Sequence, residues 1–260
     1  MCTFGCVKIV SYNVNGIRSA LSKGLGIWLE QERPDVLCLQ EIKAEQSQVD
    51  TSLFDHLGYR HFWHSAEKKG YSGVALLTRF EPDQVVVGTG IDYIDREGRV
   101  IRADYGDRSY LSIYFPSGSS GEDRQAVKMR FLDDIGDFLN RLRQERPNLV
   151  VCGDFNICHR PIDIHDPVRN ATVSGFLPEE RAWMDRYFSG GFADGFRLVV
   201  QEPHHYSWWT FRANARANNK GWRIDYTTVS DPLISQVRTA SIQPQAIHSD
   251  HCPVVLELND

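Results

Sequence analysis

The sequence predicts an α/β or α+β sandwich with β-sheets at its centre. Short apolar runs of four to seven residues, rich in Val, Ile, Leu and aromatic side chains, recur between turn or polar residues. Such runs are typical of strands that are buried on at least one face. A few segments have helical spacing instead, and no linker, fixed-period repeat or low-complexity tract interrupts the 260 residues. Strands interleaved with a few helices over this length favour one domain built around sheets.

Nine runs are predicted to be strands: residues 7–11, 36–39, 73–78, 84–88, 99–105, 110–115, 149–152, 224–229 and 253–258. This strand content is too high for a doubly wound nucleotide-binding fold. The chain also lacks the motifs Gly-x-Gly-x-x-Gly and Gly-x₄-Gly-Lys-Ser/Thr, so nothing supports a Rossmann or P-loop site.

Helical spacing is clear in two segments. Apolar residues recur every three to four positions over residues 17–29, and the pattern ends at Pro34. The same spacing over residues 131–142 ends at Pro147. A shorter helix is expected to begin near Pro178, where acidic residues would occupy the first turn.

Composition excludes several classes of protein. The chain has 34 acidic and 29 basic residues, a net charge of −5, with 42% hydrophobic and 24% charged residues, which is typical of a globular domain. No apolar run is long enough to span a membrane, and the N-terminus lacks the basic and apolar regions of a secretory signal. The six cysteines form no Cys-x-x-Cys pair, which favours reduced, core-filling cysteine. We therefore expect a cytoplasmic protein that does not bind a membrane.

Polar side chains stand at the ends of several predicted strands. They are Asn13, Glu41, Tyr114, Asp154, Asn156, Asp225, Asp250 and His251. Groups at the ends of neighbouring strands converge on one edge of a sheet, where α/β proteins build sites. Each alone has an ordinary explanation, because Asp is common in turns and helix caps and Tyr in cores. Their joint occurrence favours a functional site.

The oxygen donors in this set are hard ligands that suit Mg²⁺ or Mn²⁺ and not zinc: Asn13, Glu41, Asp154, Asn156 and Asp250. The chemistry they indicate is phosphate-ester hydrolysis, in which a metal neutralises charge on the phosphate. His251 could hydrogen-bond the phosphate, and Asp225 is a candidate to hold its imidazole in one tautomer.

Residues 203–224 combine basic and aromatic side chains without an acidic residue. The basic ones are Arg212, Arg216, Lys220 and Arg223, and the aromatic ones are Tyr206, Trp208, Trp209, Phe211 and Trp222. This mixture suits nucleic acid, with cations for phosphates and rings for bases or an extruded sugar. An aromatic core strand with a solvated basic face explains the pattern equally well.

In these residues the chain resembles the exonuclease III family of apurinic/apyrimidinic (AP) endonucleases. The matching blocks are SYNVNGIRSAL (11–21), LQEIK (39–43), KKGYSGVALLTR (68–79), REGRVIRADY (96–105), YFPSG (114–118), CGDFNICH (152–159), GFLPEERAWMD (175–185), GWRIDY (221–226) and SDHCPV (249–254). The resemblance implies a four-layered, DNase I-like sandwich of two packed mixed β-sheets flanked by helices, formed by residues 7–260 as one domain. Residues 1–6 are then a short extension, and we expect translation to begin at position 7.

The resemblance also implies roles for individual residues. The metal would be held by Asn13, Glu41 and Asp250, with Asp154, Asn156 and His251 as further candidate ligands. Catalysis would involve Tyr114, Asp154, Asn156, Asp225 and His251, and the choice of base among Asp154, Tyr114 and His251 stays open. DNA would be contacted by Tyr71, Arg99 and Asn170, and the apolar wall of a pocket for the abasic residue would come from Trp208, Trp222 and Ile224. Asn15 departs from the Asp of some family members, which removes one carboxylate from the metal site.

The implied activity is Mg²⁺-dependent cleavage of DNA 5′ to an abasic site in base-excision repair, leaving a 3′-hydroxyl, with Mn²⁺ as a substitute metal. Accessory 3′→5′ exonuclease or 3′-phosphodiesterase activity is expected, on double-stranded DNA with abasic sites or blocked 3′ ends, by a monomer. Three alternatives stay open. They are an exonuclease-dominant member, a phosphodiesterase for lipid or inositol phosphates, and a non-catalytic regulator that binds nucleic acid.

Overall fold

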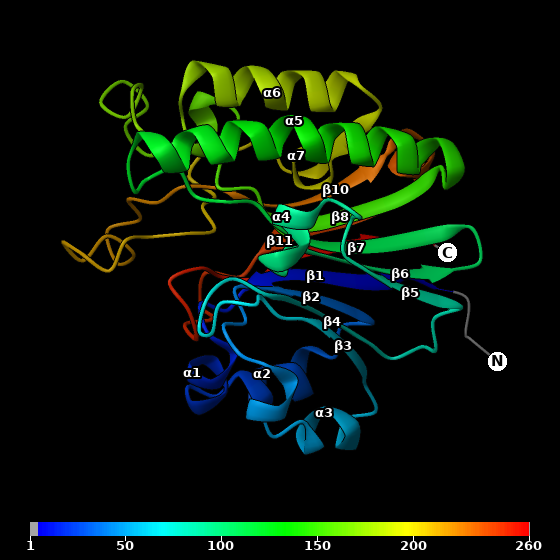
Figure 1. The fold of residues 1–260 in the computed structure, drawn as a ribbon. Coiled ribbons are helices and arrows are strands. Elements are labelled where there is room, and N and C mark those ends of the chain that lie inside the picture. Colours follow the sequence, from blue (N-terminus) through cyan, green and yellow to red (C-terminus); the bar gives the residue numbers. More distant parts are fainter. Residues whose placement is uncertain (1–4, 260) are drawn as a thin grey trace.

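The computed structural model describes residues 5–259, which form two six-stranded mixed β-sheets packed face to face (Figure 1). Sheet A has the order β11 (Val237–Ile242), β12 (Val254–Leu258), β1 (Val7–Asn13), β2 (Val36–Gln40), β4 (Val74–Thr78) and β3 (Arg60–His64). Sheet B has the order β5 (Gln84–Val87), β6 (Val100–Tyr105), β7 (Arg108–Tyr114), β8 (Asn148–Asp154), β10 (Asp225–Ser230) and β9 (Phe192–Asp194). The pairs β1–β2 and β7–β8 are parallel, and the other pairs are antiparallel.

Helices cover the outer face of each sheet, which confirms the four-layered sandwich (Figure 1). The α-helices are α1 (Ile17–Ser22), α2 (Leu25–Glu32), α3 (Ser52–His56), α4 (Asp92–Arg96), α5 (Glu122–Glu145), α6 (Pro178–Ser189) and α7 (Gly195–Val199). Three short 3-10 helices are η1 (Gln46–Gln48), η2 (Pro161–Asp163) and η3 (Asp231–Gln236). Helices α1, α2 and α3 lie on sheet A, whereas α5 and α6 lie on sheet B.

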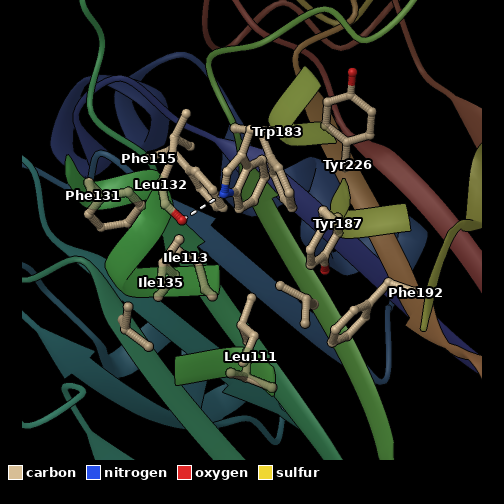
Figure 2. Close-up of a cluster of buried hydrophobic side chains, with 14 of the residues drawn as sticks. Leu111, Ile113, Phe115, Phe131, Leu132, Ile135, Trp183, Tyr187, Phe192 and Tyr226 are labelled. Atoms are coloured by element: carbon tan, nitrogen blue, oxygen red, sulfur yellow. Dashed lines mark hydrogen bonds between the residues drawn. The ribbon is translucent and has the colours of Figure 1, made fainter. Parts of the chain in front are cut away.

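Alternation of side chains along the strands separates the core into layers. On β7, Leu111 and Ile113 face α5 and α6, while Tyr110 and Tyr114 face sheet A. Figure 2 shows the helix side of this core, where the indole Nε1 of Trp183 donates to the carbonyl of Leu132 at 2.7 Å. A strand that buries both faces needs apolar residues at nearly every position, which explains the continuous apolar runs of the central strands.

All nine predicted strands are present, and three further strands, β3, β9 and β11, were missed. Strands β3 and β11 lie at the edges of sheet A and have partly exposed side chains, so they need no continuous apolar run. Strand β9 has only three residues, which is too short for such a run. The prediction of one helix over residues 17–29 is wrong. The chain forms α1 and α2 instead, because Gly24 adopts a left-handed φ of 94° between them.

Strand register sets the position of the polar residues. Tyr114 lies opposite Asp154 in the parallel pair β7–β8, and Asp225 lies opposite Asp154 in the antiparallel pair β8–β10. In sheet A, Asn13 lies opposite Gln40 at the ends of β1 and β2. The predicted residues therefore gather at one end of both sheets.

The core between the sheets supports the prediction of one domain over residues 7–260, which stays a prediction. The proposed extension of residues 1–6 lies partly outside the described residues, and β1 begins at Val7. Across residues 5–259, no helix combines the length and apolarity needed to cross a lipid bilayer. The cysteines at 38, 152, 158 and 252 are buried and unpaired, which agrees with a role in the core.

Candidate active site

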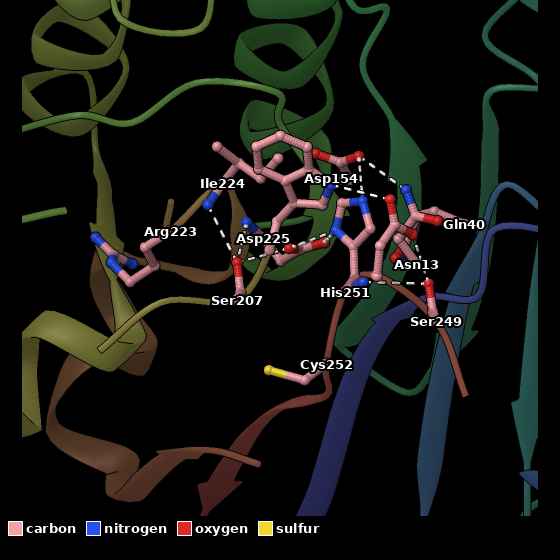
Figure 3. A network of polar contacts seen from close by, with 12 residues as sticks. Asn13, Gln40, Asp154, Ser207, Arg223, Ile224, Asp225, Ser249, His251 and Cys252 are labelled. Carbon is pink, nitrogen blue, oxygen red and sulfur yellow. Dashed lines mark hydrogen bonds and ion pairs between the residues drawn. The ribbon is translucent and has the colours of Figure 1, made fainter. Parts of the chain in front are cut away.

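The amide of Asn13 joins the ends of the two sheets. Its Nδ2 donates to Oε1 of Glu41 at 2.8 Å and to Oδ2 of Asp154 at 2.9 Å. Asn13 ends β1 in sheet A and Asp154 ends β8 in sheet B, so one buried side chain fixes the spacing of two carboxylates from different sheets (Figure 3).

Glu41 follows β2 in a left-handed conformation, with a φ of 50°. One carboxylate oxygen accepts from Asn13, and Oε2 lies 2.7 Å from the ammonium of Lys43. Burial alone would raise the pKa of Glu41, but the Lys43 charge and the Asn13 hydrogen bond lower it below its usual range. Glu41 is therefore ionised at neutral pH.

The Asp154 carboxylate is held by Asn156 and Asn13. The backbone N–H of Asn156 donates to Oδ1 at 2.8 Å, and the Asn156 side-chain amide donates to Oδ2 at 3.2 Å. That amide also donates to the Phe115 carbonyl at 3.0 Å, which fixes its orientation. Burial, followed by the charges of Asp225 and Glu41, raises the pKa of Asp154 to about 8. The site thus brings more negative charge together than its own cations neutralise.

His251 is oriented by Asp225. Its Nδ1 lies 2.9 Å from Oδ2 and 3.1 Å from Oδ1 of that carboxylate, whose Oδ2 also accepts from the Ser207 hydroxyl at 2.6 Å (Figure 3). Burial opposes the charged imidazole, but Asp225 outweighs it and the pKa of His251 rises to about 10. The opposite nitrogen, Nε2, lies 3.9 Å from Oδ2 of Asp154. His251 therefore presents a charged N–H donor beside the carboxylates.

Ligand atoms of Glu41, Asp154 and His251 all lie within 4.8 Å of one another. Burial and the neighbouring carboxylates raise the pKa of Asp154, and a divalent cation between Glu41 and Asp154 would relieve that repulsion, so the two carboxylates fit a metal ion. The charged imidazole of His251 fits an anion instead. Asp250 lies outside that group. Its Oδ1 accepts from the amide of Asn15 at 2.9 Å and its Oδ2 from the indole of Trp208 at 3.0 Å, and its role as a ligand stays a prediction.

Tyr114 lies beside the carboxylates under the guanidinium of Arg99, whose Cζ is 4.8 Å from the ring centroid. Burial, followed by Glu41 and Asp154, raises the pKa of Tyr114 well above its usual range, so the phenol stays protonated. Arg99 is 1% exposed and donates to the Tyr114 carbonyl at 2.8 Å and to the Tyr71 hydroxyl at 3.0 Å. It positions these tyrosines, and its own contact with DNA stays a prediction.

An apolar cluster that contains the residues predicted to form the pocket wall borders the carboxylates and His251. Trp208, Trp222 and Ile224 pack with Phe176 and further buried residues, Cys158 and Ile164. The indoles of Trp208 and Trp222 meet edge to face at 5.9 Å, and Trp208 also lies 6.4 Å from the ring of His251. Trp208 therefore contacts both the residues of the predicted pocket and the polar centre. We use this term for the group formed by Asn13, Glu41, Asp154, Asp225, Asp250 and His251.

Comparison with known proteins agrees with this geometry. Residues 10–251 match the model of the endonuclease/exonuclease/phosphatase family. The chain belongs to this family. An exodeoxyribonuclease of Bacillus subtilis is 39% identical over 97% of this chain and 100% of its own length, and the DNA repair nuclease APEX1 of Danio rerio is 38% identical over 97% and 82%. These relatives make the chain a hydrolytic DNA repair nuclease of the family and confirm the predicted enzyme class.

Solved structures of this family share the fold over nearly the whole chain. An AP endonuclease from Archaeoglobus fulgidus superposes with a TM-score of 0.89 at 29% identity, covering 98% of this chain and 99% of that one. The 3′ phosphatase NExo from Neisseria, bound to a product DNA hairpin, superposes with a TM-score of 0.90 at 26% identity, covering 98% and 100%. They confirm the predicted fold class.

The basic segment of residues 203–224 is only partly available to DNA. Arg223 is buried and bound to Asp163 at 2.8 Å and Asp194 at 2.6 Å. Arg216 donates to backbone carbonyls of residues 244, 246 and 249. The interpretation of these cations as phosphate ligands does not hold for Arg223, which pairs with carboxylates of the protein, or for Arg216, which binds backbone carbonyls. The exposed ones are Arg212 and Lys220.

Asn170 was predicted to contact DNA, and two residues that support the site were not predicted at all. The side-chain amide of Asn170 donates to the carbonyls of His165 and Asp166 within its own loop, so its DNA contact stays a prediction. Ser207 and Lys128, which support Asp225 and Asn156, were missed. For Lys128 a signal existed, because its spacing to the apolar residues of α5 places a charge on the buried face of that helix.

Proposed function

We propose that this nuclease cleaves the DNA backbone 5′ to abasic sites in base-excision repair, leaving a 3′-hydroxyl and a 5′-deoxyribose phosphate. The observation that carries the proposal is the contact of Trp208 with both the polar centre and the apolar wall. A phosphodiester at the carboxylates would have its neighbouring sugar at that wall. A nucleotide without a base costs little to unstack, so a small apolar pocket selects it over intact nucleotides.

Mg²⁺ is the proposed cofactor, held by Glu41 with Asp154 and His251 near, and with Asn13 and Asp250 as the further predicted ligands. Hard oxygen donors favour Mg²⁺, and Mn²⁺ would substitute. When bound, the ion supplies neutralisation of the phosphate charge and stabilisation of the departing oxygen.

The side chains divide the remaining work. Asp154 accepts the proton of the attacking water, since hydrogen bonds from Asn13 and Asn156 hold its carboxylate at the ends of both sheets beside Glu41. Asn156 fixes the direction of that carboxylate. The charged imidazole of His251 donates to a phosphate oxygen, and it is a poor base because its pKa is raised to about 10. Tyr114, with its phenol protonated, donates to the phosphate or the departing oxygen.

In this reaction the water oxygen forms a bond to phosphorus and the bond from phosphorus to the upstream 3′-oxygen breaks. The water proton passes to Asp154, which later releases it to solvent, and the departing oxygen takes a proton from solvent water to become the 3′-hydroxyl. The same chemistry at a chain end removes a nucleotide or a blocking group, so we propose accessory 3′→5′ exonuclease and 3′-phosphodiesterase activity on double-stranded DNA. The likeness to a 3′ phosphatase supports this proposal.

The test incubates the full chain with a duplex that carries one synthetic abasic site, with Mg²⁺ and separately with EDTA, beside an undamaged duplex of the same sequence. Incision 5′ to the lesion that requires the metal and leaves a 3′-hydroxyl is expected. Shortening of both duplexes from their 3′ ends would make exonuclease the main activity. DNA binding without cleavage in Mg²⁺ or Mn²⁺ would overturn the proposal in favour of a non-catalytic regulator.

A further inference from the structure

Helix α5 buries a charged side chain among apolar ones. Lys128 and Glu180 of α6 are both fully buried, and the ammonium Nζ lies 2.6 Å from Oε1 of Glu180. The same Nζ donates to the backbone carbonyl of Asn156 at 2.8 Å. A buried ion pair adds little to stability compared with apolar residues of the same volume. Stability therefore does not explain why this ion pair contacts the backbone of Asn156.

The second oxygen of Glu180 holds the loop between Gly175 and Leu177. Oε2 accepts from the backbone N–H of Gly175 at 2.7 Å and of Leu177 at 3.0 Å. This loop carries Phe176, which packs in the pocket wall with Trp208 and Trp222. One carboxylate thus ties Lys128 to the backbone that shapes the wall.

The loop at Gly175 also contacts the segment that contains Asn156 and Cys158. Gly175 accepts a hydrogen bond from the backbone N–H of Cys158 at 2.7 Å, two residues after Asn156. A Cβ at Gly175 would lie 2.8 Å from the Trp222 ring and 3.2 Å from the Asn156 carbonyl, at a φ of +99°. The backbone of Asn156 and the pocket wall therefore cannot move independently.

Asn156 itself is in a left-handed conformation, with a φ of 54°. Residues in this region persist where their surroundings hold them there, and they cluster at functional sites. The Lys128 ammonium donates to the carbonyl of Asn156 and so holds its backbone in place. The N–H and the side-chain amide of Asn156 in turn donate to Asp154. Rotation of the Asn156 backbone would release both donors to Asp154.

We propose that Lys128 is a positioning residue that, through Asn156 and Glu180, keeps the Asp154 carboxylate aligned with the pocket wall. This inference rests on the proposed hydrolytic role of Asp154 and goes beyond it. The buried pair of Lys128 and Glu180 would then raise the rate of the chemical step without contacting the substrate.

The test compares single-turnover cleavage by three variants, each present in excess over labelled DNA. The double variant Lys128→Met/Glu180→Gln removes both buried charges at nearly constant volume, which avoids leaving one charge unpaired. The conservative variant Lys128→Arg keeps a charged donor. The matched control is Asp104→Asn, because Asp104 is a buried, ion-paired carboxylate at the opposite end of sheet B, beside Arg102 and Arg146.

Single-turnover kinetics at saturating enzyme separate positioning from folding, because the rate constant then reports the folded, DNA-bound enzyme alone, and circular dichroism of each variant reports how much of the protein is folded. For the double variant we expect a rate constant about 10- to 100-fold below wild type, as for other residues that orient a catalytic group. The Kd for DNA should change by less than about threefold, and Lys128→Arg should regain most of the rate. The Asp104→Asn control should keep the wild-type rate constant even if its stability falls.

A double variant with a wild-type rate constant at saturating enzyme would make the pair purely structural and overturn the inference, whatever fraction of the protein is folded. Rates are measured on both the abasic duplex and an undamaged 3′ end. A failure of the proposed abasic substrate can then be told apart from a failure of the proposed role of Lys128. Wild-type protein that cuts only 3′ ends would contradict the proposed substrate, and the rate on those ends would still decide the role of Lys128. Wild-type protein that cuts neither would overturn both.

Discussion

The Asp154 carboxylate accepts three hydrogen bonds, two from Asn156 and one from Asn13, and two further carboxylates, Asp225 and Glu41, act on it. Side chains that only stabilised the fold would not gather negative charge in this way, because burial of unneutralised charge costs free energy. The site therefore gives up stability for an arrangement that suits the proposed base and the proposed cation. This trade is common where function demands a strained or repulsive arrangement.

The first prediction concerns this residue. Asp154→Asn should lower the single-turnover rate by about three orders of magnitude, because the amide cannot accept the water proton. Its melting temperature should equal or exceed that of wild type, because the substitution removes charge repulsion. Rapid-quench kinetics and thermal unfolding measure the two effects. Near-normal cleavage with an unchanged metal dependence would show that Asp154 is not the base.

Asp163 predicts a pH dependence of stability. Burial alone would raise its pKa, but Arg223 and Arg197 outweigh it and hold the pKa at about 2, against about 3.9 in an unfolded chain. The folded protein thus favours the ionised form, and this stabilisation is complete above about pH 4 and is lost as the pH falls towards 2. We expect Asp163→Asn to lose about 3–5 kcal/mol of unfolding free energy at pH 7, because Arg197 and Arg223 lose a buried partner.

Urea unfolding of wild type and Asp163→Asn at a series of pH values checks this prediction. The difference in unfolding free energy between them should narrow as the pH falls from about 4 to 2. A difference that is the same at pH 7 and pH 2.5 would mean that the ionised carboxylate does not contribute.

At the scale of elements, helix α5 does two different things along its length. Near its start, Lys128 reaches the backbone of Asn156, and further along, Phe131, Leu132 and Ile135 pack on sheet B (Figure 2). The acidic first turn, with Glu122 and Asp123, suits the positive end of the helix dipole. Stability and positioning therefore come from neighbouring turns of the same helix.

Substitution of Ile135 separates these contributions. Its side chain is fully buried between α5 and sheet B, so Ile135→Ala should lower the unfolding free energy by about 2–5 kcal/mol and Ile135→Val by about 0.5–1.5 kcal/mol. Because the residue does not touch the polar centre, the single-turnover rate constant of the folded protein should stay at the wild-type value. Urea titration and single-turnover kinetics measure the two quantities, and a parallel loss of rate would show that packing of α5 also sets the site geometry.

At the scale of the whole molecule, the two sheets supply different parts of one centre. Sheet A contributes Asn13 and Glu41, sheet B contributes Asp154 and Asp225, and the loop before β12 contributes His251. The centre exists only when the two sheets are packed, so a cation that binds it binds the folded state alone. Ligand binding to the folded state alone raises stability with concentration.

We therefore expect Mg²⁺ to raise the melting temperature in a saturable way, by an amount equivalent to about 2.7 kcal/mol at a concentration 100 times the dissociation constant. Glu41→Gln should reduce this shift, because it removes a charged ligand between Asn13 and Lys43. Differential scanning fluorimetry over a Mg²⁺ series measures it, with Asp104→Asn as a control that should retain the full shift. An equal shift in Glu41→Gln and wild type would place the ion elsewhere.

The sequence by itself determined the central strands and predicted the kind of chemistry at the strand ends, and its resemblance to a known family implied the two-sheet fold. Runs of apolar residues indicate buried strands whatever surrounds them, and hard oxygen donors after those strands indicate a cation and a phosphate. The blocks around Asn13, Glu41, Asp154 and His251 also carried the family resemblance, because they are short and local. The edge strands β3 and β11 escaped detection because a strand exposed on one side needs no continuous apolar run.

Only the tertiary structure decided which charges meet. Asn13 binds Asp154 across 141 positions of sequence, and the approach of the two sheets alone sets that distance. Arg216 and Arg223 look like phosphate ligands in the sequence, but in the folded chain they bind acceptors of the protein, and Arg223 is buried. Lys128 reaches Asn156 because α5 lies on sheet B. Charge and residue type are local properties, whereas burial and direction of a side chain depend on what the rest of the chain places around it.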